Sequence, residues 1–235
     1  MKKMVGLFRV MTFEELDKAA EVMLKYSPTD AYQILDETFA KTIKGDTFRR
    51  KALNNLMNVW GNGQKPLSDF QEKVLERYAI SNHDEKKSLQ VLMMLYSFSF
   101  FSDTINIIGK YLRMQDTFQS KTIMEEVRST YGMTETVNKG LLTVLGSLVD
   151  WGFLFRSKPG VYELTKHKIL ITDEFIKNVL IRSILAHTDA EYLPLEIINN
   201  QAGLFMFDYQ VSRLEVHLDD LNVLRERTDT FIGLK

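Results

Sequence analysis

Three residues at consecutive or near-consecutive positions have side chains that suit contact with the bases of a nucleic acid duplex. They are Thr136, Asn138 and Lys139. Asparagine pairs well with an adenine edge, lysine with a guanine edge or a phosphate, and the threonine methyl group meets the thymine methyl group. We therefore expect these side chains to enter a major groove.

Three basic residues near them suit contact with the phosphate backbone. Arg156 and Lys158 lie two positions apart, and Lys121 stands upstream of the three base-contacting candidates. Lysine and arginine neutralise phosphates and fix the position of a protein on a duplex, without selecting a sequence. These six residues together form the predicted DNA-binding site.

The elements around these residues predict a winged helix-turn-helix over residues 116–168. Ser120 is expected to cap a helix that ends at Tyr131-Gly132, and Thr134 to cap the next helix. In that second helix an apolar stripe is expected to face the core, with polar residues on the opposite side. The stripe comprises Val137, Leu141, Leu142, Leu145, Leu148 and Val149, and the polar side comprises Glu135, Thr136, Asn138, Lys139 and Thr143.

A hairpin should follow the second helix. Gly152 ends the helix, residues 153–155 and 161–164 have strand-like composition, and Lys158-Pro159-Gly160 is a turn signal. This hairpin is the predicted wing, and it carries Arg156 and Lys158.

The remainder of the chain predicts a mainly α fold. Residues 1–115 should form a helical bundle, with the apolar stretch Leu89–Tyr96 at its centre and a last helix beginning at Ser102 or Asp103. Its other helices are expected over residues 12–26, 29–44, 47–60, 68–80 and 83–97.

Residues 169–235 are expected to form a second winged-helix-like unit. We predict helices over residues 173–187, 194–201 and 207–221, followed by a hairpin over residues 223–234.

Composition favours a cytoplasmic protein. The 235 residues include no cysteine, so disulfides and thiolate metal sites are excluded. The N-terminus lacks the apolar core of a signal peptide, and the apolar run Leu89–Phe101 is shorter than the roughly 20 residues that span a bilayer. We expect no membrane association.

The charge is distributed unevenly along the chain, although the formal net charge is only −1. Residues 110–168 hold nine lysines and arginines against six acids, whereas residues 169–235 hold six against eleven. The basic cluster Arg49, Arg50 and Lys51 lies at a predicted helix start, where the helix dipole disfavours cations. This cluster is therefore an additional candidate for DNA contact.

No pattern in the sequence indicates catalysis, a metal or a cofactor. The four histidines (His83, His167, His187 and His217) are scattered, and no HExxH motif is present. Gly61-Asn62-Gly63 lacks the remainder of a phosphate-binding loop. We expect a protein that is not an enzyme and that carries no cofactor.

The order of parts resembles the BrxA family of BREX phage-defence systems. The likeness covers about residues 30–235 and includes the Arg49-Arg50-Lys51 cluster before Leu53, Leu56 and Trp60, the apolar helix, Phe100-Phe101, and Thr134, Lys139, Leu145 and Gly152 in the winged helix. It implies a nonenzymatic protein that binds double-stranded DNA beside other protein components of a defence complex: a methyltransferase, an ATPase and a phosphatase.

Two other functions fit the same pattern. Winged helices also serve as docking faces for proteins, and the acidic C-terminal region favours such an adaptor. Among DNA-binding proteins, a plasmid replication initiator would also use tandem winged helices, with a strong preference for a repeated site, and a transcription regulator is a related alternative.

Overall fold

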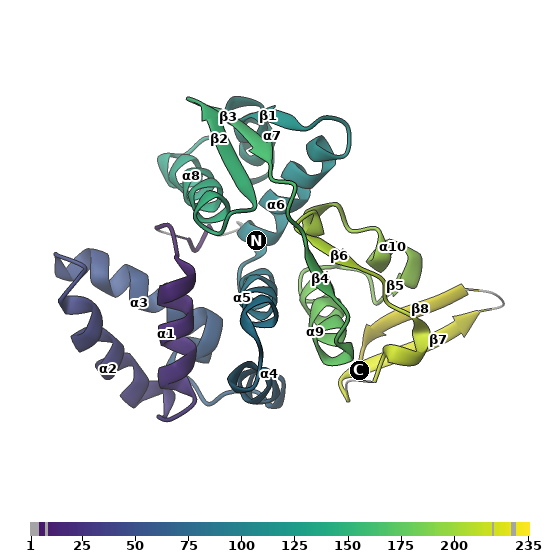
Figure 1. Cartoon of the computed structure of the whole chain (residues 1–235), viewed down its shortest axis with the longest axis horizontal. Helices are drawn as coiled ribbons and strands as arrows, with labels where there is room; N and C mark the ends of the chain where they lie inside the picture. Colours follow the sequence, from purple (N-terminus) through teal and green to yellow (C-terminus); the bar gives the residue numbers. More distant parts are fainter. Residues whose placement is uncertain (1–4, 8, 218, 227–228) are drawn as a thin grey trace.

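The computed structural model describes residues 5–7, 9–217, 219–226 and 229–235. It is mainly helical and contains three small sheets, which confirms the predicted mainly α class (Figure 1). The sheets have the strand orders β1-β3-β2, β4-β6 and β5-β8-β7.

Five helices build the N-terminal bundle. They are α1 (Phe13–Met23), α2 (Pro28–Ala40), α3 (Asp46–Trp60), α4 (Asp69–Ala79) and α5 (His83–Ser97), and a 3-10 turn, η1 (Asn62–Gln64), follows α3. Side-chain caps define the starts of α1 and α4, because Thr12 accepts from the Glu15 amide and Ser68 from the Gln71 amide. The predicted helix starts at positions 12 and 68 are therefore the positions of the two capping residues.

Helix α5 lies at the centre of the molecule. All residues from Ser88 to Leu95 are buried, and α5 packs against α1, α3, α4, α6 and α9. In Figure 1 it lies between α1 on the left and α9 on the right. The predicted place of the Leu89–Tyr96 stretch at the centre of the bundle is thus confirmed.

The middle of the chain combines three helices with a three-stranded sheet. Its elements are α6 (Ser99–Leu112), β1 (Thr117–Gln119), α7 (Ser120–Tyr131), α8 (Glu135–Asp150), β2 (Leu154–Lys158) and β3 (Val161–Leu164). Strand β3 pairs antiparallel with both β1 and β2. Helix α6 packs against α7 and α8. The predicted start of α6 at Ser102 or Asp103 is wrong by about one turn, because Phe100, Phe101 and Ser102 are already buried within the helix.

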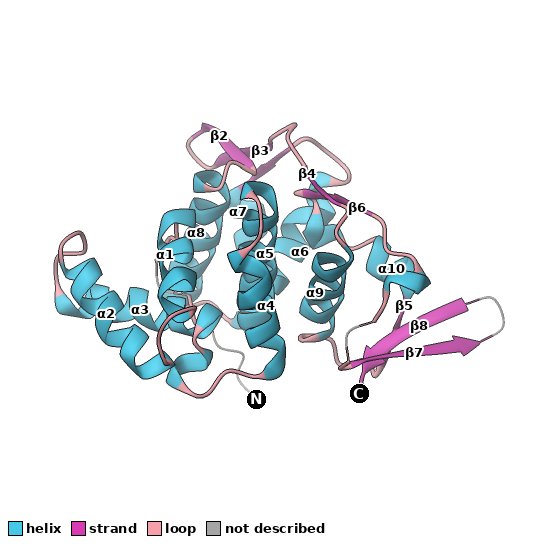
Figure 2. Cartoon of the chain, turned by 60° about the horizontal axis from the view of Figure 1, so that its bottom comes forward, coloured by secondary structure: helices cyan, strands magenta, loops and turns pink. Residues whose placement is uncertain are grey.

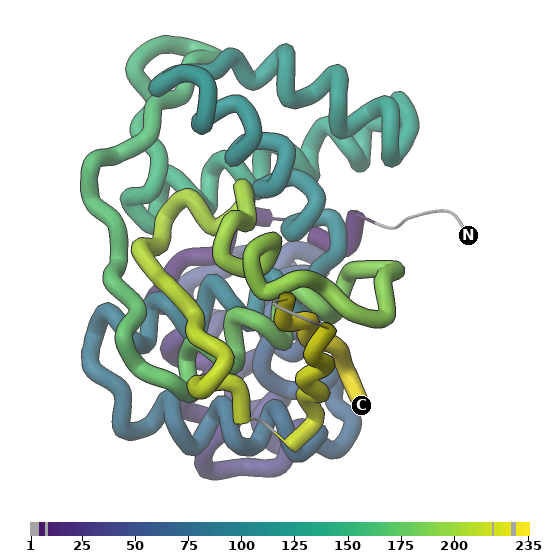
Figure 3. The backbone as a smooth tube through the Cα atoms, turned by 90° about the vertical axis from the view of Figure 1, so that its right-hand side faces the viewer, coloured from purple at the N-terminus to yellow at the C-terminus, as the bar shows by residue number. Residues whose placement is uncertain are grey.

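The C-terminal segment packs onto this framework. Its elements are β4 (Ile169–Ile171), α9 (Glu174–Leu185), β5 (Tyr192–Pro194), α10 (Leu195–Asn199), η2 (Ala202–Leu204), β6 (Phe207–Tyr209), η3 (Arg213–Glu215), β7 (Leu221–Glu226) and β8 (Asp229–Leu234). In Figure 3 this yellow-green to yellow segment lies in front of the blue helices and below the teal unit that holds α7 and α8.

The helix predicted over residues 207–221 is wrong. Phe207–Tyr209 instead forms β6, which pairs in parallel with β4, and η3 is the only helical turn among the described residues that follow up to position 217. Pairing with a strand that lies far away in the sequence overrides the local helical pattern. Among its described residues, the second unit therefore lacks the helix that would correspond to α8, although its strand order β5-β8-β7 repeats the order β1-β3-β2.

A close backbone contact joins α6 to η2. A Cβ atom at Gly109 would lie 1.8 Å from the carbonyl oxygen of Ala202, and Asn106 Oδ1 accepts a 2.9 Å hydrogen bond from the Gly203 amide. Glycine at position 109 permits this approach because it has no side chain. The contact fixes the C-terminal segment against α6.

Within the described ranges, no single helix combines the length and the hydropathy needed to cross a bilayer. Helices α5 and α6 have that length and hydropathy only when they are taken together, and they are bent by 112° relative to each other. The two hairpins, β2–β3 and β7–β8, lie at different ends of the molecule (Figure 2).

Candidate nucleic-acid interface

The β2–β3 turn meets the first turn of α7. The Ser120 amide donates a 2.8 Å hydrogen bond to the carbonyl of Gly160, whose positive φ of 78° shapes the turn. The sequence predicted Ser120 as the cap of α7, and this prediction is wrong. Ser120 is the first residue of the helix, and Gln119 holds the cap position. Lys121 thus lies beside the hairpin.

A bulge in β2 separates the two cations of the hairpin. Arg156 pairs with Tyr162 and Lys158 with Val161, with a register shift between them. Neighbouring residues of β3 point to opposite faces, and paired residues share a face, so Arg156 and Lys158 project from opposite faces of the sheet. Lys158 also belongs to β2 and not to the turn predicted for it.

All three cations at this edge are accessible. Lys121, Arg156 and Lys158 are exposed, and none forms an ion pair with another residue that the structure describes. We call these three residues the hairpin cations. Their charge is available to an external anion.

The polar residues at the start of α8 contact one another. Thr134 caps the helix as predicted, with its hydroxyl accepting from the Val137 amide at 3.3 Å. Lys139 Nζ lies 3.5 Å from a Glu135 carboxylate oxygen, although both side chains are about 70% exposed. Asn138 Oδ1 accepts a 2.9 Å hydrogen bond from Arg128 Nε. Asn138 and Lys139 must therefore give up these partners to contact a base.

The exposed face of α8 differs from the predicted one. Leu142, expected in the core, is 54% exposed, whereas Thr143, expected on the polar side, is only 7% exposed. Thr136 is exposed as predicted. The expectation was wrong at both positions, because a segment outside the predicted unit covers part of this helix and Leu142 lies outside the covered part.

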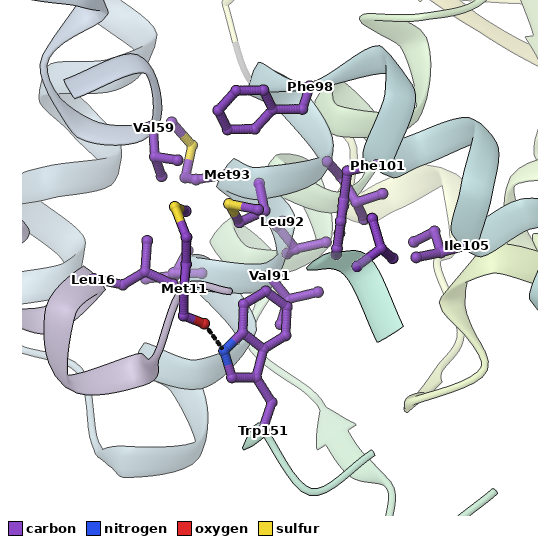
Figure 4. Packing of buried hydrophobic residues seen from close by; sticks show 14 of the residues in the cluster. Met11, Leu16, Val59, Val91, Leu92, Met93, Phe98, Phe101, Ile105 and Trp151 are labelled. Atoms are coloured by element: carbon purple, nitrogen blue, oxygen red, sulfur yellow. Dashed lines mark hydrogen bonds between the residues drawn. The ribbon is translucent and has the colours of Figure 1, made fainter. Parts of the chain in front are cut away.

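That segment is the N-terminal stretch before α1. The Met11 amide donates to Ser147 Oγ at 3.1 Å, and Trp151 Nε1 donates to the Met11 carbonyl at 2.8 Å (Figure 4). The side chains of Val5 and Val10 lie so close to α8 that a Cβ at Gly140 or Gly146 would come within 2.5 Å of a valine methyl group. From Gly140 onward α8 is consequently covered on this side, and its first turn is the most accessible.

The far end of α8 is acidic. Burial raises the pKa of the Asp150 carboxyl group, and the neighbouring Glu14 raises it further. Phosphates would be repelled from this end. The charge along α8 thus favours contact only near its N-terminus.

The Arg49-Arg50-Lys51 cluster lies on α3, apart from the β2–β3 hairpin (Figures 1 and 2). Arg49 forms ion pairs with Asp36 at 2.6 Å and Asp46 at 2.9 Å, and these partners raise the pKa of its guanidinium group. Arg50 and Lys51 are exposed. Arg49 therefore has a structural role within the bundle, and DNA contact by this cluster stays a prediction.

Three cations that the sequence interpretation missed lie on the other side of α6. Lys110 and Arg113 are one turn apart at the end of α6, and Lys168 follows β3. All three line cavities beside the C-terminal segment. The one-turn spacing of Lys110 and Arg113 was visible in the sequence, but the opposing wall comes from residues about 90 positions later.

Among the residues that the structure describes, no group of three or more histidine, aspartate or glutamate side chains is placed to hold a metal ion. No family model, curated protein or solved structure matches this chain.

Proposed function

We propose that residues 99–164 form a winged helix-turn-helix that binds double-stranded DNA through its hairpin. The element order α6, β1, α7, α8, β2, β3 and the strand order β1-β3-β2 are those of a winged helix-turn-helix. The arrangement supports the proposal, and the hairpin cations give it a chemical basis.

The observation that carries the proposal is the availability of the hairpin cations. Lys121, Arg156 and Lys158 are exposed at one edge, and each would release counterions from the DNA on contacting a phosphate. Their positive charge meets no described acidic partner. Such contacts add affinity for any DNA sequence.

The bulge extends the reach of the hairpin. With Arg156 and Lys158 on opposite faces, the hairpin can contact phosphates on both sides of a groove. Helix α8 contributes less, because Asn138 is bonded to Arg128, Lys139 is paired with Glu135, and the rest of the helix is partly covered. We infer weak binding with little sequence preference.

A triple variant tests this proposal. Lys121→Ala/Arg156→Ala/Lys158→Ala should lower the affinity for a random 30-base-pair duplex by about tenfold or more at low salt, because three phosphate contacts are lost. Fluorescence anisotropy with labelled duplex measures the change. Lys41→Ala/Lys44→Ala/Lys65→Ala is the matched control, since it removes three exposed lysines from the N-terminal bundle. Equal affinity of the two variants would contradict the proposal.

A protein-docking role is the second candidate, and Leu142 favours it. This leucine is 54% exposed on α8, next to the oppositely charged Glu135 and Lys139. Retention of a protein partner that Leu142→Asp abolishes, together with absence of DNA binding at low salt, would select this function over the first.

A role in a phage-defence complex rests on the likeness of layout to the BrxA family. Genes for a methyltransferase and a large ATPase beside the gene for this chain would support that role. A plasmid replication origin beside it would favour a replication initiator.

A further inference from the structure

Three adjoining cavities follow α6 on the side that faces the C-terminal segment. Their volumes are about 210, 560 and 230 Å³. The first two share Asp103, Asn106 and Gln201 as lining residues, and the second and third share Arg113 and Gln201. We call this continuous feature the α6 groove. It lies between α6 and residues 197–204.

The outer end of the α6 groove is basic. Lys110, Arg113 and Lys168 line it and are exposed, against two acids, Asp208 and Asp103, the second of which also lines the inner end. Arg113 donates to the carbonyl of Asn200, which holds its guanidinium group at the wall. Guanidinium has five N–H donors, so others remain for a ligand. This end suits a phosphate group.

The inner end combines apolar walls with polar side chains, among them Asp103, His187, Asn106 and Gln201. Leu95, Leu193 and Leu204 are among its apolar lining residues. Asn106 Oδ1 accepts from the Gly203 amide, so the amide NH₂ of Asn106 is the group left for a ligand. Gln201 Nε2 donates to the Ile197 carbonyl at 3.1 Å, so its side-chain oxygen is left as an acceptor.

A donor next to an acceptor is complementary to the polar edge of a nucleobase, which carries both kinds of group. The apolar walls suit the faces of its ring. The inner end thus has the composition of a base pocket.

The two ends are separated along the axis of α6. Asp103, at the inner end, lies seven residues before Lys110, which corresponds to roughly 10 Å of helix. The Asp103 carboxylate accepts a 2.7 Å hydrogen bond from the Tyr131 hydroxyl. The acid is therefore engaged within the protein, about two helical turns before Lys110.

We propose that the α6 groove binds a nucleotide, with the base at the inner end and the phosphate between Lys110 and Arg113. This site is separate from the hairpin cations, and it does not depend on duplex binding by them. A free nucleotide and the terminal nucleotide of a strand present the same chemistry.

Isothermal titration calorimetry of the full chain tests the site. The probes are AMP, GMP, CMP and UMP, the matching nucleosides, and inorganic phosphate. At least one monophosphate should bind about tenfold more tightly than its nucleoside and than inorganic phosphate, because only the nucleotide uses both ends of the groove.

Two variants separate the ends. Lys110→Ala/Arg113→Ala should reduce the affinity for the monophosphate to about that of the nucleoside, while nucleoside binding is unchanged. Gln201→Met, which preserves the size of the side chain, should weaken the nucleoside and the nucleotide but not inorganic phosphate. Lys41→Ala/Lys44→Ala, which removes two exposed lysines of the bundle, should change none of these affinities.

The source of the nucleotide follows from one further probe. The probe is a 5′-phosphorylated dinucleotide. If it binds more tightly than the mononucleotide, the ligand is a strand end, and if it binds equally or more weakly, the ligand is a free nucleotide. Both outcomes support the site. The proposal is overturned if no monophosphate binds, if inorganic phosphate binds as tightly, or if Lys110→Ala/Arg113→Ala matches the unchanged protein. The Lys121→Ala/Arg156→Ala/Lys158→Ala variant should keep nucleotide binding, so failure of the duplex proposal is seen separately.

Discussion

The cations of this protein differ in what surrounds them, and this difference determines which can serve a ligand. Arg49 and Lys177 are enclosed by acids, with Lys177 only 8% exposed and 2.7 Å from Glu215. Lys121 and Lys158, by contrast, are exposed at the hairpin. Residue type alone predicts neither role. Only the partner brought near by the fold separates a structural cation from one that is available to phosphate.

The Lys177–Glu215 pair gives a pH-dependent contribution to stability. The bond to Lys177, aided by the Ser212 amide, lowers the pKa of Glu215 to about 2, below an unfolded-state value of roughly 4.3. Stability from this carboxylate is thus fully present above about pH 5 and is lost as the pH falls towards 2. Urea unfolding at pH 7, 5 and 3 should show Glu215→Gln less stable at pH 7 by about 1.5–3 kcal/mol, with the difference shrinking at pH 3. A difference that stays constant with pH would contradict this role.

At the scale of elements, α6 and η2 are joined by a contact that tolerates no side chain. Gly109→Ala would place a Cβ 1.8 Å from the Ala202 carbonyl oxygen, and such overpacking costs about 1–3 kcal/mol. We expect the thermal midpoint measured by circular dichroism to fall by about 2–12 °C. Lys110→Ala is the control, because Lys110 is the next residue and is exposed, and it should change the thermal midpoint little. An unchanged midpoint for Gly109→Ala would show that the two segments can separate.

Elements with strong local signals were predictable, and those made by distant contacts were not. The caps at Thr12, Ser68 and Thr134 placed three helix starts correctly. The strand β6 was mistaken for a helix because its partner β4 lies about 38 positions earlier. For the candidate site, the sequence identified the hairpin cations, but the bulge in β2 and the covering of α8 by Val5, Val10 and Met11 depend on tertiary packing. Of the α6 groove, only the one-turn spacing of Lys110 and Arg113 was visible in the sequence, because its opposing wall also depends on distant contacts.

At the scale of the whole molecule, the proposed DNA-binding edge and the acidic C-terminal segment lie apart. The β2–β3 hairpin and the β7–β8 hairpin lie at different ends (Figures 1 and 2). Residues 110–168 hold nine basic against six acidic residues, and residues 169–235 hold six against eleven. Separation of the two charges lets one end approach a polyanion while the other is repelled, which orients the molecule on a duplex.

The salt dependence of duplex binding tests the central claim most directly. Three phosphate contacts predict that the logarithm of the association constant falls with the logarithm of salt concentration with a slope of roughly −3. The measurement is fluorescence anisotropy of the unchanged protein with a random 30-base-pair duplex, from 20 to 200 mM salt, concentrations chosen to bracket roughly the physiological range. A slope near −3 supports contact by the hairpin cations. A slope near zero, or no binding at the lowest salt, would contradict the account.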